Sequence, residues 1–464
     1  MILKITKDAD RVWKYKFRNV PALDEKTRQL IKDMKETLEF TGGVGLAAPQ
    51  VGQPLRIFIA DYGSLRETFI NPKILTIGKE TSGGEEGCLS IPGFRGLVKR
   101  PNQLTIEYID AKGNKKQAKL TGFYARIIQH EYDHLSSVFY VDRITNKKKN
   151  LYEFEPIRIA FFGTNDFSAT VLRSMIGQAT VGEYNIPLVI TAPPKLAGRE
   201  QKPRVTAVET LAKQFDLPVE APSWLVKKSK TDEKEKDERV INEELIKKIK
   251  LAKADCIVVA SYGKILPKEI LNLPKHGAIN VHASLLPKYR GASPIQAAIA
   301  AGEEFTGVTI MQMNEKMDEG PIIAQAKQRI GAKETYETLS AKLAPLGANL
   351  LNHVIHLWVA EKLKTKPQNP KKATYTKILT KEDGFIDLVK PPKNLSNLVR
   401  AYHPWPGVWT YYEVTSNKGQ VTRKIIKLLP DQKVQLEGKK PVSLKEFRSG
   451  HKDFTLSWWN PLDR

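Results

Sequence analysis

Short apolar runs that alternate with helical patterns constrain the middle of this chain more than any other feature of its sequence. The apolar runs lie at 157–162, 187–190, 256–260, 278–281 and 308–313. Helical patterns lie between them, at 168–176, 206–215 and 295–301. Parallel strands need long crossover connections, which are usually helices, so this alternation predicts a mostly parallel α/β sheet.

Asn280 and His282 stand at the end of the fourth apolar run. They point to the same side of a strand because strand side chains alternate. Open α/β sheets place their reacting groups at such strand ends, although a core histidine beside a strand-end asparagine is the alternative. Asp318 follows the fifth run in a glycine-rich turn, where an acid most often serves only to form the turn. Together, an amide, an imidazole and a carboxylate can stabilise an oxyanion and move a proton.

The residues around this pair carry a longer pattern. Positions 280–292 read Asn-x-His-x-Ser-Leu-Leu-Pro-x-x-Arg-Gly-Ala, which resembles the signature of enzymes that transfer a formyl group from 10-formyltetrahydrofolate. The resemblance implies that a neutral amine attacks the formyl carbon and that Asn280 and a protonated His282 stabilise the oxyanion. Asp318 would move the proton through water. The folate pocket would be lined by Ser284, Leu285, Leu286 and Pro287.

The first third of the chain has the marks of a metal site. His130 and His134 are four residues apart and share one face of a helix, which is the geometry that two metal ligands need. Glu131 between them can then act as a general base toward water that the metal activates. A surface helix with chance spacing is the alternative. Short strands are predicted around this segment, at 55–60, 68–70, 103–109 and 116–121.

The third metal ligand is not on the same helix. No further histidine or glutamate follows His134 at the spacing of the zinc proteases, so Cys88 is the candidate third ligand. A thiolate with two imidazoles suits iron(II), zinc, cobalt or nickel, and it leaves one position open for water.

Three motifs in this third resemble those of the peptide deformylase family, in that family's order. They are Gly-x-Gly-Leu-Ala-Ala-Pro-Gln at 43–50, Glu-Gly-Cys-Leu-Ser at 86–90 and Gln-His-Glu-x-Asp-His-Leu at 129–135. The resemblance implies an α+β domain that removes the N-formyl group from nascent peptides, with iron(II) as the native metal. One departure is Ser137, where the family usually has glycine.

The same resemblance assigns roles to individual residues. The metal ligands would be Cys88, His130 and His134. Glu131 would be the base. Gln50 and the backbone amide of Leu89 would polarise the formyl oxygen, because preset donors stabilise an oxyanion. Gly45 would lie beside the substrate backbone.

A basic loop in the middle third points to the amine that is formylated. Residues 191–199 resemble the loop by which methionyl-tRNA formyltransferases hold the acceptor stem. By that resemblance, phosphate contacts would come from Lys195, Arg199, Lys202 and Arg204. The loop departs from the family pattern in detail, and an ordinary polar surface loop is the alternative.

Positive charge is concentrated at the end of the chain. The net charge is +23, and residues 364–464 hold 20 basic and 9 acidic side chains. A basic terminal domain is typical of a polyanionic partner, although a basic surface kept for solubility is the alternative. Residues 380–413 resemble the C-terminal domain of methionyl-tRNA formyltransferases, which implies an OB-like β-barrel along the tRNA. Strands are predicted at 387–388, 407–412, 422–429 and 433–436. Trp405, Trp409 and Tyr411 are expected in the core of this domain, and stacking platforms for nucleic acid are the alternative.

The cysteine content and the length of the apolar runs indicate the cellular compartment. Cys88 and Cys256 are far apart and form no disulfide framework, which favours a reducing compartment. No apolar run reaches the length of a membrane span. We therefore expect a cytoplasmic protein with no membrane contact. The charged segment 227–250 is expected to be an exposed excursion, either helical or mobile, without catalytic residues.

We predict a multidomain α+β and α/β protein with three domains. These are a deformylase-like domain at 1–152, a Rossmann-like parallel-sheet formyltransferase domain at 157–363 and an OB-like domain at 373–464. The predicted partners are initiator methionyl-tRNA and N-formylmethionyl nascent peptides near the ribosome. The alternatives are a formyltransferase for another small amine, or a deformylase tethered to translation by an inactive transferase.

Overall fold

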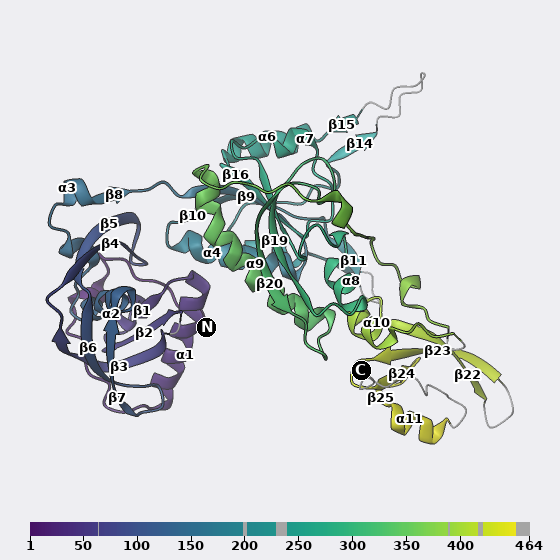
Figure 1. Cartoon of the computed structure of the whole chain (residues 1–464), viewed down its shortest axis with the longest axis horizontal. Helices are drawn as coiled ribbons and strands as arrows, with labels where there is room; N and C mark the ends of the chain where they lie inside the picture. The colour runs from purple at the N-terminus through teal and green to yellow at the C-terminus, as the bar shows by residue number, and fades with distance from the viewer. Residues whose placement is uncertain (64, 198–201, 229–238, 388–389, 416–420, 452–464) are drawn as a thin grey trace. The chain divides into compact units, whose positions relative to one another are not determined.

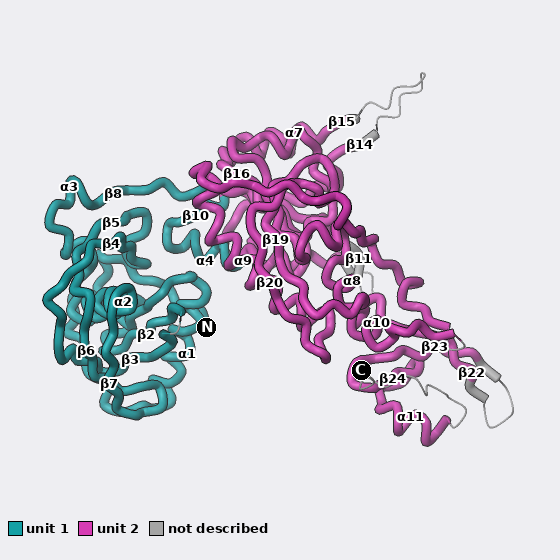
Figure 2. The backbone as a smooth tube through the Cα atoms, viewed as in Figure 1, with its two compact units in different colours: residues 1–158, 173–186 teal, residues 159–172, 187–464 magenta. Residues whose placement is uncertain are grey.

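The computed structural model of the chain describes residues 1–63, 65–197, 202–228, 239–387, 390–415 and 421–451. The contacts within it define two compact units, which Figure 2 distinguishes by colour. Unit 1 comprises 1–158 and 173–186, and unit 2 comprises 159–172 and 187–464. Among the described residues, no helix is both long enough and apolar enough to cross a membrane.

Unit 1 is built on two antiparallel sheets. The larger has the order β1 (Gly45–Ala47), β2 (Ile57–Tyr62), β3 (Leu65–Ile77), β6 (Gln103–Ile109) and β7 (Lys115–Thr121) (Figure 1). The smaller has the order β4 (Thr81–Cys88), β5 (Ile91–Pro101) and β8 (Leu151–Glu153). The four predicted strands correspond to β2, β3, β6 and β7. The long β4–β5 hairpin was not predicted, because its sequence is rich in glycine, which strands disfavour.

Two helices complete the core of unit 1. Helix α1 (Glu25–Thr41) begins where the Asp24 side chain accepts a hydrogen bond from the Thr27 amide, and it ends at Gly42, whose φ of +66° favours glycine. Helix α2 (Gly122–His134) buries Ile127 and Ile128 against the larger sheet. Its C-terminal half carries His130, Glu131 and His134, so the packing of α2 holds these side chains in place.

Unit 2 is centred on a seven-stranded sheet that is mostly parallel, as predicted. Its order is β13 (Val219–Glu220), β10 (Tyr184–Ile190), β9 (Ile157–Gly163), β16 (Cys256–Ala260), β17 (Ala278–His282), β19 (Phe305–Gln312) and β20 (Ile322–Arg329). The last two strands pair antiparallel. The predicted helices correspond to α4 (Asp166–Thr180), α5 (Ala207–Gln214) and α8 (Pro294–Ala300). Further helices include α7 (Lys268–Leu271) and α9 (Tyr336–Val359).

The second half of the charged segment 227–250 is helical, which was one of the two expected forms, but it is not exposed as expected. Residues 243–252 form α6 (Glu243–Ala252), which the Asn242 side chain caps and which buries Leu245 and Ile249 in the core beside the sheet. The apolar positions are four residues apart and lie on one face, so this face packs in the core although many charges surround it. Before it, β14 (Val226–Lys228) pairs with β15 (Arg239–Ile241), and 229–238 lie outside the described residues.

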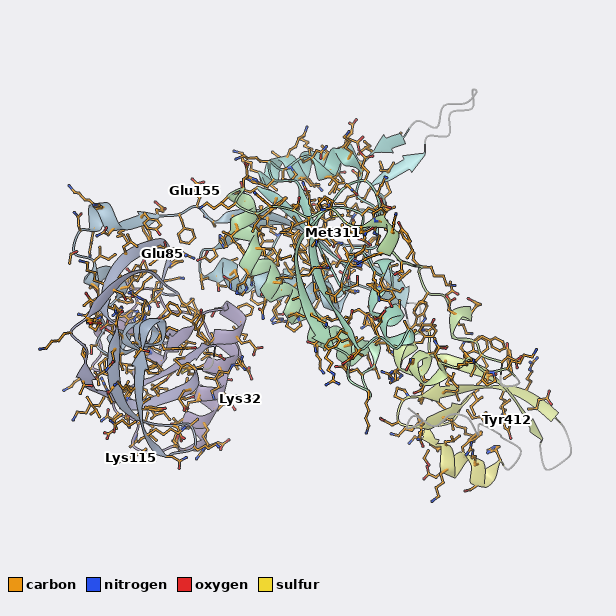
Figure 3. The ribbon with its side chains drawn as sticks, in the orientation of Figure 1. Lys32, Glu85, Lys115, Glu155, Met311 and Tyr412 are labelled. Carbon is orange, nitrogen blue, oxygen red and sulfur yellow. The ribbon has the colours of Figure 1, made fainter. Side chains whose placement is uncertain are left out.

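The C-terminal part of unit 2 is a four-stranded antiparallel sheet packed on two helices. The strands are β22 (Val408–Thr415), β23 (Val421–Leu429), β24 (Lys433–Leu436) and β25 (Val442–Ser443), and the helices are α10 (Leu395–Tyr402) and α11 (Leu444–Gly450). Tyr412 lies in the core beside this sheet. Met311, on β19 of the seven-stranded sheet, is also buried (Figure 3). Three of the four predicted strands are present, whereas Asp387 is not in a strand and Leu388 lies outside the described residues.

The prediction that three aromatic residues lie in the core of this domain is wrong for two of them. Trp409 is buried, but Trp405 is 55% exposed and Tyr411 is 40% exposed. Side chains two apart in a strand share a face, and the core face of β22 carries Val408 and Tyr412 instead. Trp409 and Tyr411 therefore share the opposite face of the sheet, where Trp409 is buried and Tyr411 is exposed.

Candidate active sites

The strand β4 and the helix α2 bring three metal-ligating side chains of unit 1 together. Cys88 ends β4, and His130 and His134 lie one turn apart on α2. The three ligand atoms lie within 4.8 Å of one another, and Cys88 Sγ is 3.3 Å from His134 Nε2. The structure thus brings together the three residues that were predicted as ligands.

The chemistry of these residues fits a transition metal. A thiolate sulfur with two imidazole nitrogens is a donor set that binds iron(II), zinc, cobalt or nickel. His130 Nδ1 lies 2.9 Å from Glu86 Oε2, which leaves Nε2 to face a metal. Glu131 is buried beside the ligands, and its Oε2 has no hydrogen-bond partner among the described residues. A buried carboxylate oxygen without a partner is expected where a metal or water belongs.

A buried network of charges supports His130 from behind. Arg100 donates to both carboxylate oxygens of Glu86, at 2.7 and 2.8 Å, and to Asp133 at 2.8 Å. Arg126 donates to Glu86 at 2.7 Å. Burial opposes the charge of Glu86, but hydrogen bonds from Arg100 and His130 hold its pKa well below the usual value. The roles of Arg100 and Arg126 were not predicted, because nothing in the local sequence connects them to Glu86.

The other predicted residues of this site lie around the ligands. Gln50 Nε2 is 3.5 Å from Cys88 Sγ, while its Oε1 accepts a hydrogen bond from the Ala47 amide. Leu89 lies in the two-residue turn between β4 and β5. A Cβ atom at Gly45 would lie 2.3 Å from Glu131 Oε1, so only glycine allows this close approach. Burial raises the pKa of Glu131 to about 7, which suits a group that gains and loses a proton near neutrality.

Ser137 follows the ligand helix in a strained conformation. Its φ is +56°, in the left-handed region that favours glycine, the residue expected here from the motif resemblance. The Ser137 hydroxyl donates to the Trp13 carbonyl at 2.8 Å, which helps to hold this conformation.

The carboxyl end of β17 brings together the second predicted set, in unit 2. Asn280 and His282 are buried, and Asn280 Nδ2 donates to Asp318 Oδ1 at 3.3 Å. His282 Nδ1 lies 3.7 Å from Asp318 Oδ2. His282 Nε2 lies 2.9 Å from the Tyr289 carbonyl oxygen, which can only accept, so Nε2 carries a proton.

Gln368 orders the loop that carries Asp318. Its amide nitrogen donates to the carbonyl oxygens of Asp318 and Gly320, at 2.8 and 2.7 Å, and its oxygen accepts from Arg290 Nε and Nη2. Asp318 itself has a φ of +53° and accepts a hydrogen bond from the Gly291 amide at 2.7 Å. Gln368 was not predicted, because it lies in the Pro- and Lys-rich segment 364–372, which falls between two predicted domains.

The segment that was predicted to line the folate pocket follows β17 directly. The Ser284 hydroxyl donates to the Lys288 carbonyl at 2.7 Å, and the Leu286 amide donates to Thr309 Oγ1 at 3.1 Å. Gln325 Nε2 donates to the Leu286 carbonyl at 2.9 Å. These bonds connect the loop 284–287, which includes Leu285 and Pro287, to β19 and β20 and so fix its path.

The predicted tRNA loop is described only in part. Lys195 and Lys202 lie on the short paired strands β11 (Lys195–Ala197) and β12 (Lys202–Arg204), and Arg204 is exposed. Arg199 lies outside the described residues.

Both halves of the chain match known protein families. Residues 2–150 match the family of polypeptide deformylases. Residues 157–355 match the formyl transferase family, and residues 378–433 match the formyl transferase C-terminal domain. The deformylase match covers both ligand motifs, and the formyl transferase match covers Asn280, His282 and Asp318.

Individual proteins are also similar. The methionyl-tRNA formyltransferase of Alkaliphilus oremlandii is 37% identical over 319 residues, which cover 64% of this chain and 97% of that protein. The one from Thermodesulfovibrio yellowstonii is 39% identical, over 63% of this chain and 96% of that protein.

Among solved structures, the peptide deformylase from Thermotoga maritima is 38% identical, covering 32% of this chain and 99% of that one, with a TM-score of 0.31. The formyltransferase match implies a folate-type formyl donor, and the deformylase match together with Cys88, His130 and His134 indicates a metal. The chain therefore belongs to the methionyl-tRNA formyltransferase family, and it carries a polypeptide deformylase domain in the same polypeptide.

Proposed function

We propose that this chain is a bifunctional enzyme of translation initiation. One half transfers a formyl group from 10-formyltetrahydrofolate to the amino group of initiator methionyl-tRNA. The other half hydrolyses the N-formyl group from nascent peptides. The observation that carries this proposal is that one chain contains two convergent sets of side chains, Asn280/His282/Asp318 and Cys88/His130/His134.

In the transfer reaction, the methionyl amine attacks the formyl carbon and the formyl oxygen becomes an oxyanion. The Asn280 amide has two hydrogens and needs only one for Asp318, so the other can donate to the oxyanion. His282 adds positive charge when protonated. Asp318 accepts one proton from the attacking nitrogen through water. It returns this proton to the folate nitrogen as the carbonyl re-forms and the bond between the formyl carbon and that nitrogen breaks. The loop 284–287 would hold the folate.

In the hydrolysis reaction, Cys88, His130 and His134 would hold the metal, which we propose to be iron(II). The metal would supply Lewis acidity toward water and the formyl oxygen. Glu131 takes a proton from the attacking water and returns it to the departing amine, and its buried position supports this role. Gln50 and the Leu89 amide would donate to the oxyanion, and Gly45 leaves room for the substrate backbone.

Both proposed substrates belong to protein synthesis, so we propose that the protein acts in the cytoplasm and that deformylation occurs near the ribosome. Phosphate contacts to the tRNA would come from Lys195, Arg199, Lys202 and Arg204. The 20 basic side chains of residues 364–464, against 9 acidic ones, support a second contact with the tRNA backbone. A formyltransferase for a small amine would not need this charge.

The decisive experiment follows labelled formyl from 10-formyltetrahydrofolate to methionyl-tRNA. Wild type should transfer the label, His282→Ala should lose at least about 100-fold in rate, and His353→Ala, a matched change at an exposed histidine of unit 2, should not. Hydrolysis of an N-formylmethionyl peptide is measured in parallel, and Glu131→Gln should abolish only that activity. No transfer by wild type, with tRNA still bound, would instead identify a deformylase tethered by an inactive transferase.

A further inference from the structure

The outer face of the C-terminal sheet carries residues that such a face does not normally show. Val408 and Tyr412 of β22 and Ile426 of β23 fill the core, so the alternate residues of these strands point away from it. Exposed faces of antiparallel sheets are usually polar. The outer face of β22 instead carries Trp409 and Tyr411. Their partners on β23 are Lys427 and Ile425.

Three aromatic rings gather on this face. Phe385 reaches it from the segment beside β22, which approaches so closely that a Cβ atom at Gly384 would lie 1.9 Å from the Gly407 carbonyl oxygen. The ring centroids of Phe385 and Trp409 are 5.1 Å apart, and those of Trp409 and Tyr411 are 5.4 Å apart. Phe385 is 43% exposed and Tyr411 is 40% exposed. Two large aromatic rings are therefore in contact with solvent and do not contribute to the core.

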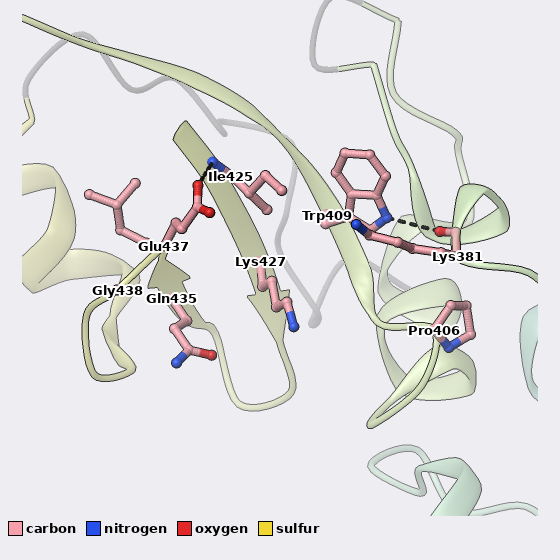
Figure 4. A pocket seen from close by; sticks show the side chains of 9 residues that line it. Lys381, Pro406, Trp409, Ile425, Lys427, Gln435, Glu437 and Gly438 are labelled. Carbon is pink, nitrogen blue, oxygen red and sulfur yellow. Dashed lines mark hydrogen bonds between the residues drawn. The ribbon is translucent and has the colours of Figure 1, made fainter. Parts of the chain in front are cut away.

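Cations lie directly on these rings. The Arg423 guanidinium is 4.2 Å from the centre of the Tyr411 ring, and the Lys381 ammonium is 5.5 Å from the Trp409 ring. The Trp409 indole nitrogen donates to the Lys381 carbonyl at 2.9 Å, which fixes the plane of the indole (Figure 4). Lys427 lies on the same face. Cations over aromatic rings attract the phosphate of a ligand while the rings meet its planar part.

A pocket opens beside the rings. It has a volume of about 340 Å³ and is lined by Lys381, Pro406, Trp409, Ile425, Lys427, Gln435, Leu436, Glu437 and Gly438. Figure 4 shows the indole on one side of it and Gln435 and Glu437 on the other. The Glu437 carboxylate accepts a hydrogen bond from the Ile425 amide, so this acid is held at the strand edge. Volumes of roughly 300–1,000 Å³ are usual for ligand pockets.

We infer that this outer face is a stacking platform for an unpaired nucleotide of RNA. Phe385 and Tyr411 stack on the base, and Arg423, Lys381 and Lys427 contact the phosphates on either side. A base inside a duplex cannot reach the rings, so the platform selects single-stranded segments. That the RNA is the tRNA rests on the proposed function.

The test uses the full chain with a single-stranded RNA of roughly ten nucleotides and with the duplex of the same strand. Tyr411→Leu keeps an apolar side chain but removes the ring, and it should weaken single-strand binding about tenfold while leaving duplex binding unchanged. The salt dependence should also stay the same, because no charge is lost. Lys427→Gln should weaken binding and reduce the salt slope by about 1.

Tyr62→Leu is the matched control. Tyr62 is 45% exposed and packs on Phe123 as Tyr411 packs on Trp409, but it lies in unit 1. It should not change RNA binding. Single-strand binding by Tyr411→Leu equal to wild type, or an equal loss on the duplex, would overturn the inference. If Tyr411 governs single-strand binding but wild type transfers no formyl group to methionyl-tRNA, the platform stands and the proposed function alone fails.

Discussion

Replacing Glu86 with glutamine should weaken both the fold of unit 1 and its hold on a metal. Glu86 accepts two hydrogen bonds from Arg100 and one from Arg126, and it lies 2.9 Å from His130 Nδ1. Glutamine has one acceptor oxygen and no charge, so both buried guanidinium groups lose their shared counter-charge. Its amide group also cannot accept from His130 and both arginines at once.

The expected loss follows from this geometry. Removing one partner of a buried ion pair costs about 3–5 kcal/mol. Arg100 keeps its bond to Asp133, so we expect a value at the lower end, about 3 kcal/mol in the free energy of unfolding. Loss of a hydrogen-bond acceptor behind a metal-binding histidine typically lowers metal affinity by about 10–100-fold.

Urea unfolding of the metal-free protein measures the first effect, and competition with a chelator measures the second. Glu85→Gln is the matched control, because the neighbouring Glu85 pairs with Arg95 at a solvent-exposed position. That change should cost less than about 1 kcal/mol and leave metal affinity unchanged. If Glu86→Gln is also within about 1 kcal/mol of wild type and binds metal equally well, the network does not support His130.

Three further predictions separate the two activities. Gln368→Leu removes the hydrogen bonds that order the Asp318 loop. It should lower kcat/KM for formyl transfer about tenfold and leave deformylation unchanged. An equal fall in both activities would indicate general unfolding instead. Gly45→Ala would place a Cβ atom against Glu131 and should lower the rate of deformylation about 100-fold in a peptide-hydrolysis assay. Activity near that of wild type would argue against the tight contact between residue 45 and Glu131. A chelator should abolish deformylation but not formyl transfer, and added iron(II) or zinc(II) should restore it; transfer that also stops would place a metal in the second site.

Several features of the fold could be predicted because their physical cause is local. Strand 278–282 follows from a β-branched apolar run, and the side that Asn280 and His282 share follows from the two-residue period of strands. The pairing of His130 with His134 follows from the helical period in the same way. In each case a few adjacent residues contain all the information that is needed.

Other features could not be predicted because they depend on residues far apart in the sequence. Glu86 and Arg126 are 40 positions apart, and Gln368 is 50 positions from Asp318. The charges around α6 indicated exposure, but packing against the sheet buried its apolar face. The sequence near a residue does not indicate which distant residues will contact it in the folded protein.

The sequence by itself determined the two motif sets and the alternation that builds the parallel sheet. The same period places Trp409 and Tyr411 on one face of β22, but the face that meets the core was decided only by the tertiary structure. Alternation is symmetric between the two faces of a strand, and only the residues that pack against it break that symmetry. Here Val408, Tyr412 and Ile426 form the core, so Trp409 and Tyr411 lie on the outer face, where the Tyr411 ring is exposed to solvent.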